Sequence, residues 1–365
     1  MSTAAGEPLP QEIRQAAAAA QEQLQSYLGG NWMARHLVYV CAKLGLADLL
    51  RDGPRPSQEL AAAAGAHAPT LHRVLRGMVA FRLVTETEDG RFALDEAGQL
   101  LRSDAPHGLR GRVIKERELE LAWGGLLHTV RTGEPAFEHV FGEPPFAHFA
   151  RDPATHPHLN PGTTWEVAQA IAAAYDFGAS QTVADVGGGD GIVLAAILRR
   201  NRHLRGTVLD YPHQMEPARR VAARYGVADR FRFAAGDFFQ GVPEADVYVL
   251  KTILHDWDDP QATRILQRCR EAMSERGRVL VVETLLPERA VGASHRFDLV
   301  MMVETGGRER TGAEYGALFE AAGLRLSGIR PLYAGRYAGR SLIEGDAGRA
   351  LVEGMAPGAA PPGGH

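Results

Sequence analysis

The stretch VADVGGGDGI, residues 183–192, decides the fold because it places four glycines within five positions directly after a short apolar run. Glycines at the end of a strand let a ligand approach the backbone closely, so this stretch predicts a nucleotide-type site in a strand–turn–helix unit. A dinucleotide-binding turn needs a third glycine where Ile192 stands, and a phosphate-binding P-loop needs a lysine that this stretch lacks. Asp185 favours a cationic or hydroxyl-bearing ligand over a pyrophosphate.

Short β-branched runs alternate with helical stretches from Thr182 onward, which is typical of an α/β fold with a doubly wound parallel sheet. The expected strands are TVADV, RGTVLD, RFRFAAGD, ADVYVLK and RVLVVETLL, at residues 182–186, 205–210, 230–237, 245–251 and 278–286. Near the end, RLSGIRPLY (325–333) and RSLIEGD (340–346) are expected to form a closing pair of strands.

Two further carboxylates follow successive strands of this sheet. Asp210 ends the second strand, where a carboxylate can accept both hydroxyls of a ribose. Asp237 ends the third and precedes Phe238, and a carboxylate beside an aromatic ring suits an adenine base. Each acid alone is also a common helix cap. Because ligands bind at the carboxyl ends of parallel strands, three acids in register favour a nucleoside site.

Residues 11–105 have the outline of a winged helix. Helical patterns cover 11–28 and 32–51, Ser57 is expected to cap a short helix that stops at Gly65, and a second helix follows. A hairpin is expected around Asp89–Gly90. Residues 57–100 carry four basic and six acidic side chains, which argues against DNA binding and leaves packing against a second subunit as the expected use.

The rest of the chain sets broad limits. We expect residues 106–178 to form a helical linker or substrate-lid region rich in aromatic side chains, 179–345 the ligand-binding domain and 346–365 a disordered tail. Net charge is −4, and no apolar run is long enough to span a membrane. Cys41 and Cys269 are far apart and fit reduced packing residues, so we expect a cytoplasmic protein that binds neither nucleic acid nor membrane.

At this point the sequence resembles the S-adenosylmethionine-dependent O-methyltransferases that include plant caffeic acid O-methyltransferase and bacterial enzymes tailoring anthracyclines, mitomycin and enediyne naphthoates. The resemblance covers roughly residues 30–345 and is most specific in DVGGGDG (185–191), LHDWDD (254–259) and GGRERT (306–311). It implies a class I methyltransferase domain behind an N-terminal winged-helix dimerisation domain, and therefore a homodimer. It also implies a cofactor site made by Asp185, Gly187, Gly189, Gly191, Asp210, Tyr211, Asp237, Phe238 and Lys251.

His255, in the stretch that follows the fourth strand, is the candidate general base. Imidazole titrates near neutrality and can take a phenol proton as the methyl group moves. By the resemblance, Glu283 and Glu309 match two glutamates that flank this histidine and orient it. Asp258 or Asp259, before Pro260, is expected to cap a helix.

A metal is not expected at this site. Catechol-type methyltransferases hold a divalent ion with several carboxylates, but three acids in a strand-to-helix turn are more often caps, and a neutral base makes an ion unnecessary. The candidate residues for the acceptor pocket, each of which also fits a plain core role, are Trp123, His128, Phe146, Trp165, Asp256, Met301 and Met302.

O-methylation of an aromatic hydroxyl of a secondary metabolite is the function that these features favour. The alternative keeps the fold and S-adenosylmethionine but performs hydroxylation, decarboxylation or a pericyclic step, as some relatives of the anthracycline enzymes do. The remaining hypotheses are a DNA-binding regulator and an N- or C-methyltransferase. The acceptor itself is not readable from the sequence.

Overall fold

The computed structural model describes residues 32–105, 108–151, 165–289, 295–332 and 340–346. These residues form two compact units whose boundary lies between Glu118 and Leu119, so the helical region expected at 106–178 is divided between them. The helix expected at 11–28 lies outside the described residues, as does the tail expected at 346–365 except for Asp346, which is the last residue of a strand. Among the helices that are described, none is long and apolar enough to cross a membrane.

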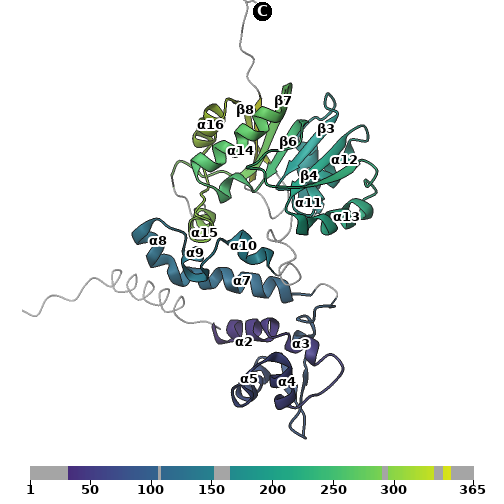
Figure 1. The fold of residues 1–365 in the computed structure, drawn as a ribbon, viewed down its shortest axis with the longest axis vertical. Coiled ribbons are helices and arrows are strands. Elements are labelled where there is room, and N and C mark those ends of the chain that lie inside the picture. The colour runs from purple at the N-terminus through teal and green to yellow at the C-terminus, as the bar shows by residue number, and fades with distance from the viewer. Residues whose placement is uncertain (1–31, 106–107, 152–164, 290–294, 333–339, 347–365) are drawn as a thin grey trace, which may run out of the picture. The chain divides into compact units, whose positions relative to one another are not determined.

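The N-terminal unit is helical with one small hairpin (Figure 1). The hairpin pairs Val84 with Leu94 in antiparallel register around Gly90, as the sequence predicted. Gly65 ends a helix in the left-handed conformation, also as predicted. The elements are α2 (Trp32–Lys43), α3 (Leu46–Leu49), α4 (Ser57–Ala64), α5 (Ala68–Ala80), β1 (Val84–Glu86), β2 (Phe92–Leu94), α6 (Glu96–Gln99) and most of α7 (Arg110–Ala122), which continues past the boundary of the unit.

The expected cap at Ser57 is wrong. Pro56 is the N-cap of α4, and Ser57 is the first helical residue, so its hydroxyl does not bind the helix's own amides. The Ser57 hydroxyl lies 3.1 Å from Nδ1 of His72 instead. The Ser57 side chain, which local propensity assigns to a helix cap, therefore contacts the next helix instead.

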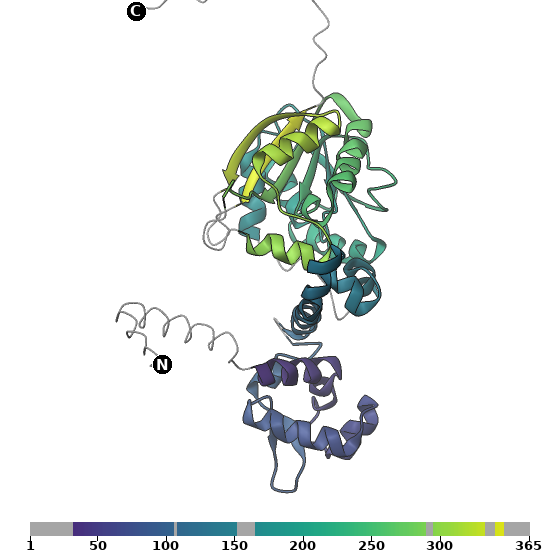
Figure 2. The same cartoon turned by 90° about the vertical axis from the view of Figure 1, so that its left-hand side faces the viewer.

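The second unit is built on a seven-stranded sheet of order β5-β4-β3-β6-β7-β9-β8. The first five strands in this order are parallel, and β9 is antiparallel to both β7 and β8. The C-terminal hairpin lies at one edge of the sheet beside α16 (Gly312–Ala321) (Figure 2). The strands are β3 (Thr182–Val186), β4 (Arg205–Asp210), β5 (Phe231–Ala235), β6 (Ala245–Lys251), β7 (Met273–Thr284), β8 (Arg325–Leu332) and β9 (Arg340–Asp346).

Alternating apolar side chains give the sheet one core on each face. Val247 and Val249 of β6 pack with α11 and α12, whereas Tyr248 and Leu250 pack with α14 and α16. The helices of this unit, with three short 3-10 turns, are η1 (Trp123–Gly125), α8 (Leu126–Thr132), α9 (Ala136–Phe141), α10 (Pro145–Ala150), α11 (Trp165–Ala174), α12 (Ile192–Arg200), η2 (Pro212–Gln214), α13 (Met215–Arg224), η3 (Leu254–Asp256), α14 (Asp259–Ala272), α15 (Arg296–Glu304) and α16 (Gly312–Ala321).

The strand order reverses between β3 and β6. The chain passes from β3 to β4 and β5 on one side, then returns to place β6 on the other side of β3. Such a switch point opens a crevice outside the carboxyl ends of the two central strands, where ligands of this architecture bind. The glycine turn follows β3 and the His255 segment follows β6, so both predicted parts of the site begin at this crevice.

Candidate active site

The glycine turn after β3 is built around two carboxylates. Asp185 is 1% exposed, and a Cβ on Gly188 would lie 2.5 Å from its carboxyl carbon, so only glycine fits above it. Asp210, at the end of β4, accepts hydrogen bonds from the amides of Gly189 and Tyr211 at 2.8 and 2.7 Å. The turn and the second strand are therefore tied together at the crevice.

The charges at this turn are set mainly by burial. Burial raises the pKa of Asp185 to about 7 against the opposing effect of Lys251, and it also raises the pKa of Asp210. Oδ2 of Asp185 is buried and has no hydrogen-bond partner. A cation beside this turn would stabilise both ionised carboxylates, so the acids present fit a cationic nucleoside such as S-adenosylmethionine.

Aromatic side chains gather beside the third predicted carboxylate. Asp237 follows β5, and Phe238 and Phe239 both contact Trp257 edge-on, with ring centroids 6.0 and 4.7 Å from its ring. Phe146, from α10, stacks on the same indole at 5.9 Å. Trp257 was not among the predicted site residues, and it links the expected adenine region to the turn that carries His255.

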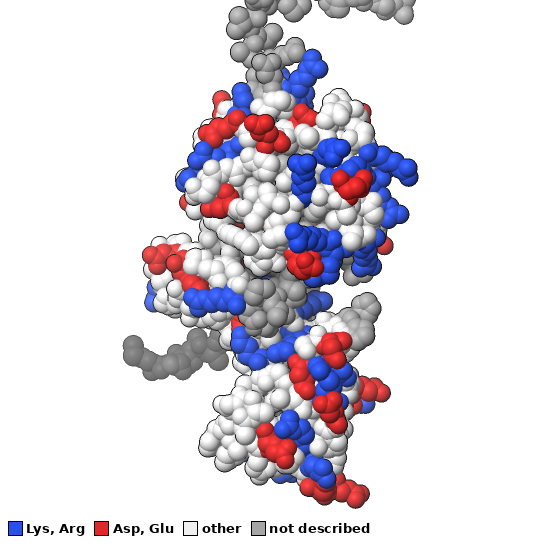
Figure 3. Space-filling view, turned by 45° about the vertical axis from the view of Figure 1, so that its right-hand side comes forward, with Lys and Arg blue, Asp and Glu red and all other residues white. Residues whose placement is uncertain are grey.

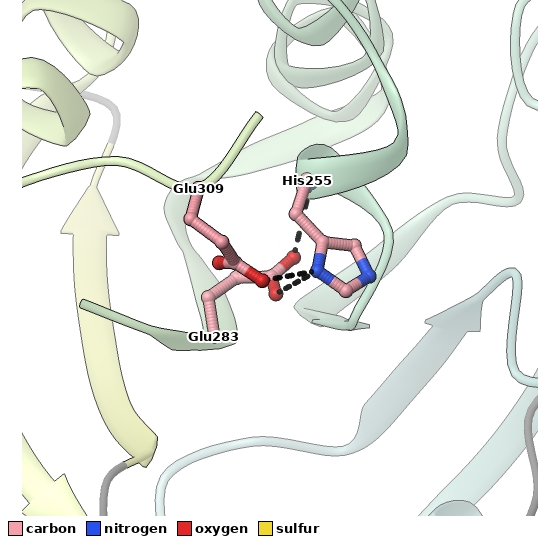
Figure 4. Close-up of side chains that lie close together, drawn as sticks. All are labelled: His255, Glu283 and Glu309. Carbon is pink, nitrogen blue, oxygen red and sulfur yellow. Dashed lines mark hydrogen bonds and ion pairs between the residues drawn. The ribbon is translucent and has the colours of Figure 1, made fainter. Parts of the chain in front are cut away.

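The catalytic candidates converge from three separate segments (Figure 4). Nδ1 of His255 lies 2.9 Å from Oε1 of Glu309 and 3.6 Å from Oε2 of Glu283, and Nε2 lies 3.7 Å from Oδ1 of Asp256. Both glutamates are buried, and 13% of the histidine side chain is exposed. The structure therefore brings together all three residues that the sequence assigned to proton transfer.

Opposing effects act on the pKa of His255. Burial alone lowers it, but Glu283, Asp256 and Glu309 favour the imidazolium more strongly and raise the pKa from 6.5 to about 10. Among the described residues, His255, Glu283 and Glu309 are also the group whose ligand atoms lie close enough together to hold a metal ion. The hydrogen bond between Nδ1 and Glu309 accounts for the same arrangement without an ion.

The backbone before His255 is strained. Thr252 has a φ of +52°, a conformation that costs a β-branched residue free energy and is found mostly at functional sites. Its amide donates to the carbonyl of Val282, and Nζ of Lys251 donates to its hydroxyl. Lys251 therefore lies at the end of β6, between the predicted cofactor residues and the turn that carries His255, Leu254–Asp256, which we call the catalytic turn.

The predicted pocket residues divide into two groups. Asp256 and, through Trp257, Phe146 lie at the catalytic turn. Trp123 and Met302 pack on the small core under α8–α10 and α15, Met301 is buried in α15, and His128 stacks on His139. Trp165 stacks on Tyr225 at 3.7 Å on the outer helices, with Arg199 near its ring. For both groups an acceptor-binding role stays a prediction.

Asp258 is the N-cap of α14 and accepts a hydrogen bond from the amide of Gln261, which confirms one of the two predicted caps. Asp259 does something else, because its carboxylate accepts from the buried guanidinium of Arg310. Sequence reasoning missed Arg310 as a site residue. The run Arg-Glu-Arg at 308–310 contains only charged side chains, and nothing in it indicates which of them is buried.

The mixed sheet of parallel central strands, its reversal between β3 and β6 and the bare, acidic turn after β3 match a class I methyltransferase fold, and the imidazole–carboxylate group follows β6. Comparison with protein families agrees, since residues 123–325 match the model of an O-methyltransferase domain and residues 26–104 match that of an O-methyltransferase dimerisation domain. The first match alone covers more than half of the chain. The chain belongs to this O-methyltransferase family, and S-adenosylmethionine is its cofactor.

Individual relatives are similar over most of their length. A phenazine O-methyltransferase, PhzM of Lysobacter antibioticus, is 43% identical over 86% of this chain and 93% of the relative. An 8-amino-8-demethylriboflavin N,N-dimethyltransferase of Streptomyces davaonensis is 34% identical over 81% and 88%. The solved O-methyltransferase NcsB1 from neocarzinostatin biosynthesis, in complex with S-adenosylmethionine and 2-hydroxy-5-methyl naphthoic acid, is 36% identical with a TM-score of 0.63, over 86% of this chain and 95% of that one.

Proposed function

We propose that this protein methylates a phenolic hydroxyl group of an aromatic secondary metabolite, with His255 as the general base. The hydrogen bond from Nδ1 of His255 to the buried carboxylate of Glu309 is the observation that carries the proposal. With Nδ1 donating, the neutral imidazole keeps its lone pair on Nε2, the nitrogen that remains for an acceptor hydroxyl.

The chain's contribution to the chemistry is the transfer and storage of one proton. S-adenosylmethionine, when bound, supplies a methyl group on a cationic sulfur. The acceptor's O–H proton passes to Nε2, and Glu283 and Glu309 stabilise the resulting imidazolium. The raised pKa of His255, about 10, is close to that of a phenol, about 10, so the proton transfer is nearly balanced in free energy, and near neutral pH the imidazolium must first release its proton to give the neutral base.

The cofactor is proposed to lie across the carboxyl ends of β3, β4 and β5. Asp210 would accept the ribose hydroxyls, Asp237 with Phe238 would bind the adenine, and the turn at 187–191 would pass beside the methionine part. Tyr211 directly follows Asp210 in the sequence and is 41% exposed, and Lys251 ends β6. We propose that both side chains line the cofactor site. The supporting observation is the pair of backbone amides that hold the Asp210 carboxylate in place.

Calorimetric titration with S-adenosylmethionine tests this placement. Asp210→Asn keeps the size of the side chain but removes the charge, and we expect it to weaken binding about tenfold or more because charged hydrogen bonds to the ribose are lost. Asp229→Asn is the matched control, since Asp229 is an exposed acid that pairs with Arg230 in the turn before β5, outside the proposed cofactor site. Equal affinity of Asp210→Asn and wild type would refute the assignment.

A panel of phenols, with the methylated product measured by mass spectrometry, tests the reaction. We expect His255→Ala to lower kcat by about 10²-fold or more for every phenol accepted, because the proton has no acceptor. N-methylation is the second candidate, because two relatives are named as N-methyltransferases, one of them an N,N-dimethyltransferase. An aniline is already unprotonated near neutral pH and needs no base, so turnover of anilines that survives His255→Ala would identify that reaction instead.

We also propose that the protein is a homodimer, with a winged-helix dimerisation domain over residues 11–105 and a methyltransferase domain over 179–345. The match of residues 26–104 to a dimerisation-domain model supports this. Trp32 and Met33 on α2 are 58% and 50% exposed, which is unusual for large apolar side chains on a free surface. Light scattering should give twice the chain mass of 39.5 kDa, and a monomer mass would contradict the proposal.

A further inference from the structure

We propose that Arg310 is a positioning residue for the proton-transferring imidazole. Its guanidinium binds the backbone on both sides of His255 and thereby fixes where the imidazole points. The inference rests on the proposed role of His255, and it concerns a side chain that touches neither the imidazole nor the predicted cofactor residues.

The guanidinium of Arg310 is fully buried and is hydrogen-bonded at each of its nitrogens. Nη1 donates to the carbonyl of Leu254 at 2.9 Å, and Nη2 donates to the carbonyl of Trp257 at 2.8 Å. Nε donates to Oδ1 of Asp259 at 2.9 Å, which supplies the counter-charge. The two carbonyls precede and follow His255, so one rigid, planar group spans the turn that carries the base.

The same turn needs outside partners because it is a single 3-10 turn of three residues, Leu254–Asp256, and such turns hold few hydrogen bonds of their own. Oε1 of Glu283 accepts from the amides of Ile253 and Leu254 at 3.0 and 3.1 Å. Amides are therefore held by Glu283 and carbonyls by Arg310. Together they fix both ends of a backbone segment that begins beside the strained Thr252.

The loop that carries Arg310 also carries Glu309, the direct partner of the imidazole. This loop lies against the turn at backbone contact, because a Cβ on Gly307 would be 2.1 Å from the carbonyl oxygen of His255. The amide of Glu309 is in turn held by Asp298 of α15 at 3.0 Å. Adjacent residues thus hold the imidazole and its backbone, and a shift of one would misalign the other.

This arrangement predicts an effect on the chemical step rather than on binding. Removing the guanidinium of Arg310 leaves the predicted cofactor carboxylates intact but lets the 254–257 segment move relative to Glu309. A misplacement of about 1 Å lowers a rate by about 10²-fold. We expect Arg310→Lys, which keeps the charge but cannot span two carbonyls, to lower kcat by about 10- to 100-fold with an accepted phenol, while the affinity for S-adenosylmethionine stays within about twofold.

The first experiment is NMR spectroscopy of the full-length protein with 15N-labelled histidine, and it needs no methyl acceptor. The Nδ1–H proton of His255, assigned by its loss in His255→Gln, should resonate at low field because it is shared with a carboxylate. Arg310→Lys should shift or broaden this signal. Arg308→Lys is the matched control, because Arg308 is a half-exposed neighbour that pairs with Glu314 and, at 3.7 Å, with Asp259, and lysine keeps the charge of both exposed pairs; it should leave the signal unchanged.

A second variant guards against misfolding. Asp259→Asn removes the charged partner of Arg310 from an exposed side chain and creates no cavity, so it should give the same change in a smaller degree. An unchanged Nδ1–H signal and kcat in Arg310→Lys would overturn the proposal, as would equal changes in Arg308→Lys. If Arg310→Lys moves the signal while wild type methylates no phenol, the positioning role stands and the proposed reaction fails.

Discussion

At the residue scale, the proton of His255 is held by charge against the effect of burial. The side chain lies among three carboxylates, two of them fully or almost fully buried, so its imidazolium is favoured even though a buried charge is normally costly. In the proposed reaction, the proton taken from the acceptor is the one whose binding this arrangement strengthens. The same feature therefore links the chemistry to the stability of the folded chain.

Because the pKa of His255 differs between the folded and unfolded chain, the stability of the protein should depend on pH. A histidine whose pKa is raised in the fold stabilises the protein fully below the unfolded value of 6.5, and this contribution disappears as pH rises to about 10. The free energy of unfolding of wild type should therefore fall more steeply over that range than that of His255→Gln. Urea unfolding at a series of pH values measures both curves. Parallel curves would mean that His255 has an ordinary pKa in the folded protein.

The sequence singled out most of the charged residues of the candidate site, but not the way they are held. Three aspartates at strand ends, His255 and its two glutamates were assigned from position and motif. Arg310, Gly307 and Trp257 were not, because their roles are contacts between a loop and a turn about 50 residues apart in the chain. Such contacts exist only once the sheet has brought the two segments together.

At the element scale, α14 begins immediately after the catalytic turn, and its first turn fixes where that turn ends. Asp258 accepts from the amide of Gln261, with Pro260 inside the first turn. The N-cap thus sets the point at which the chain leaves the 3-10 turn and enters the helix. Asp259, one residue later, ties that first turn to Arg310.

Removing this cap should be measurable. Asp258→Ala should lower the free energy of unfolding by about 1 kcal/mol, since the Gln261 amide loses its partner at the start of a helix. Asp258→Asn keeps an oxygen acceptor at the same place and should lie near wild type. Denaturation midpoints of the three proteins provide the comparison. If alanine and asparagine behave alike, the cap contributes nothing and the helix is held by its packing.

The β strands were the most predictable elements, because alternating β-branched runs report a buried sheet directly. All five expected parallel strands and the closing pair appear. The insertion of β9 between β7 and β8 was not foreseeable, since local pattern does not say which edge a returning strand joins. It was also not foreseeable that the Ser57 hydroxyl would contact His72 instead of capping the helix.

At the scale of the whole molecule, charge is strongly segregated. Residues 199–232, over the end of α12, α13 and the β4–β5 edge, contain nine arginines and three acids in a chain of net charge −4. Figure 3 shows the blue side chains gathered on the right-hand side of the methyltransferase unit. Among the described residues, only Arg220 and Arg230 of this group form ion pairs. The remaining guanidiniums project a local positive field.

This segregation predicts chromatographic behaviour that net charge alone does not. Near neutral pH and at low salt, the protein should be retained on a sulfonate cation exchanger despite a sequence pI of about 6.4. Exchanging Arg200, Arg202 and Arg219 for glutamine should abolish retention. The same number of changes at the exposed Arg73, Arg131 and Arg289 is the control, and it should have little effect. Equal losses in both triple variants would mean that total charge decides.

The order of the site along the chain has a consequence for synthesis on the ribosome. The predicted cofactor carboxylates are complete by Asp237, whereas the imidazole at 255 receives its last partner only at Glu309, 54 residues later. The C-terminal hairpin that closes the sheet follows later still. A nascent chain therefore carries every cofactor carboxylate before it can orient its base, and translation arrested in between would yield a polypeptide with the residues for holding the methyl donor but not for using it.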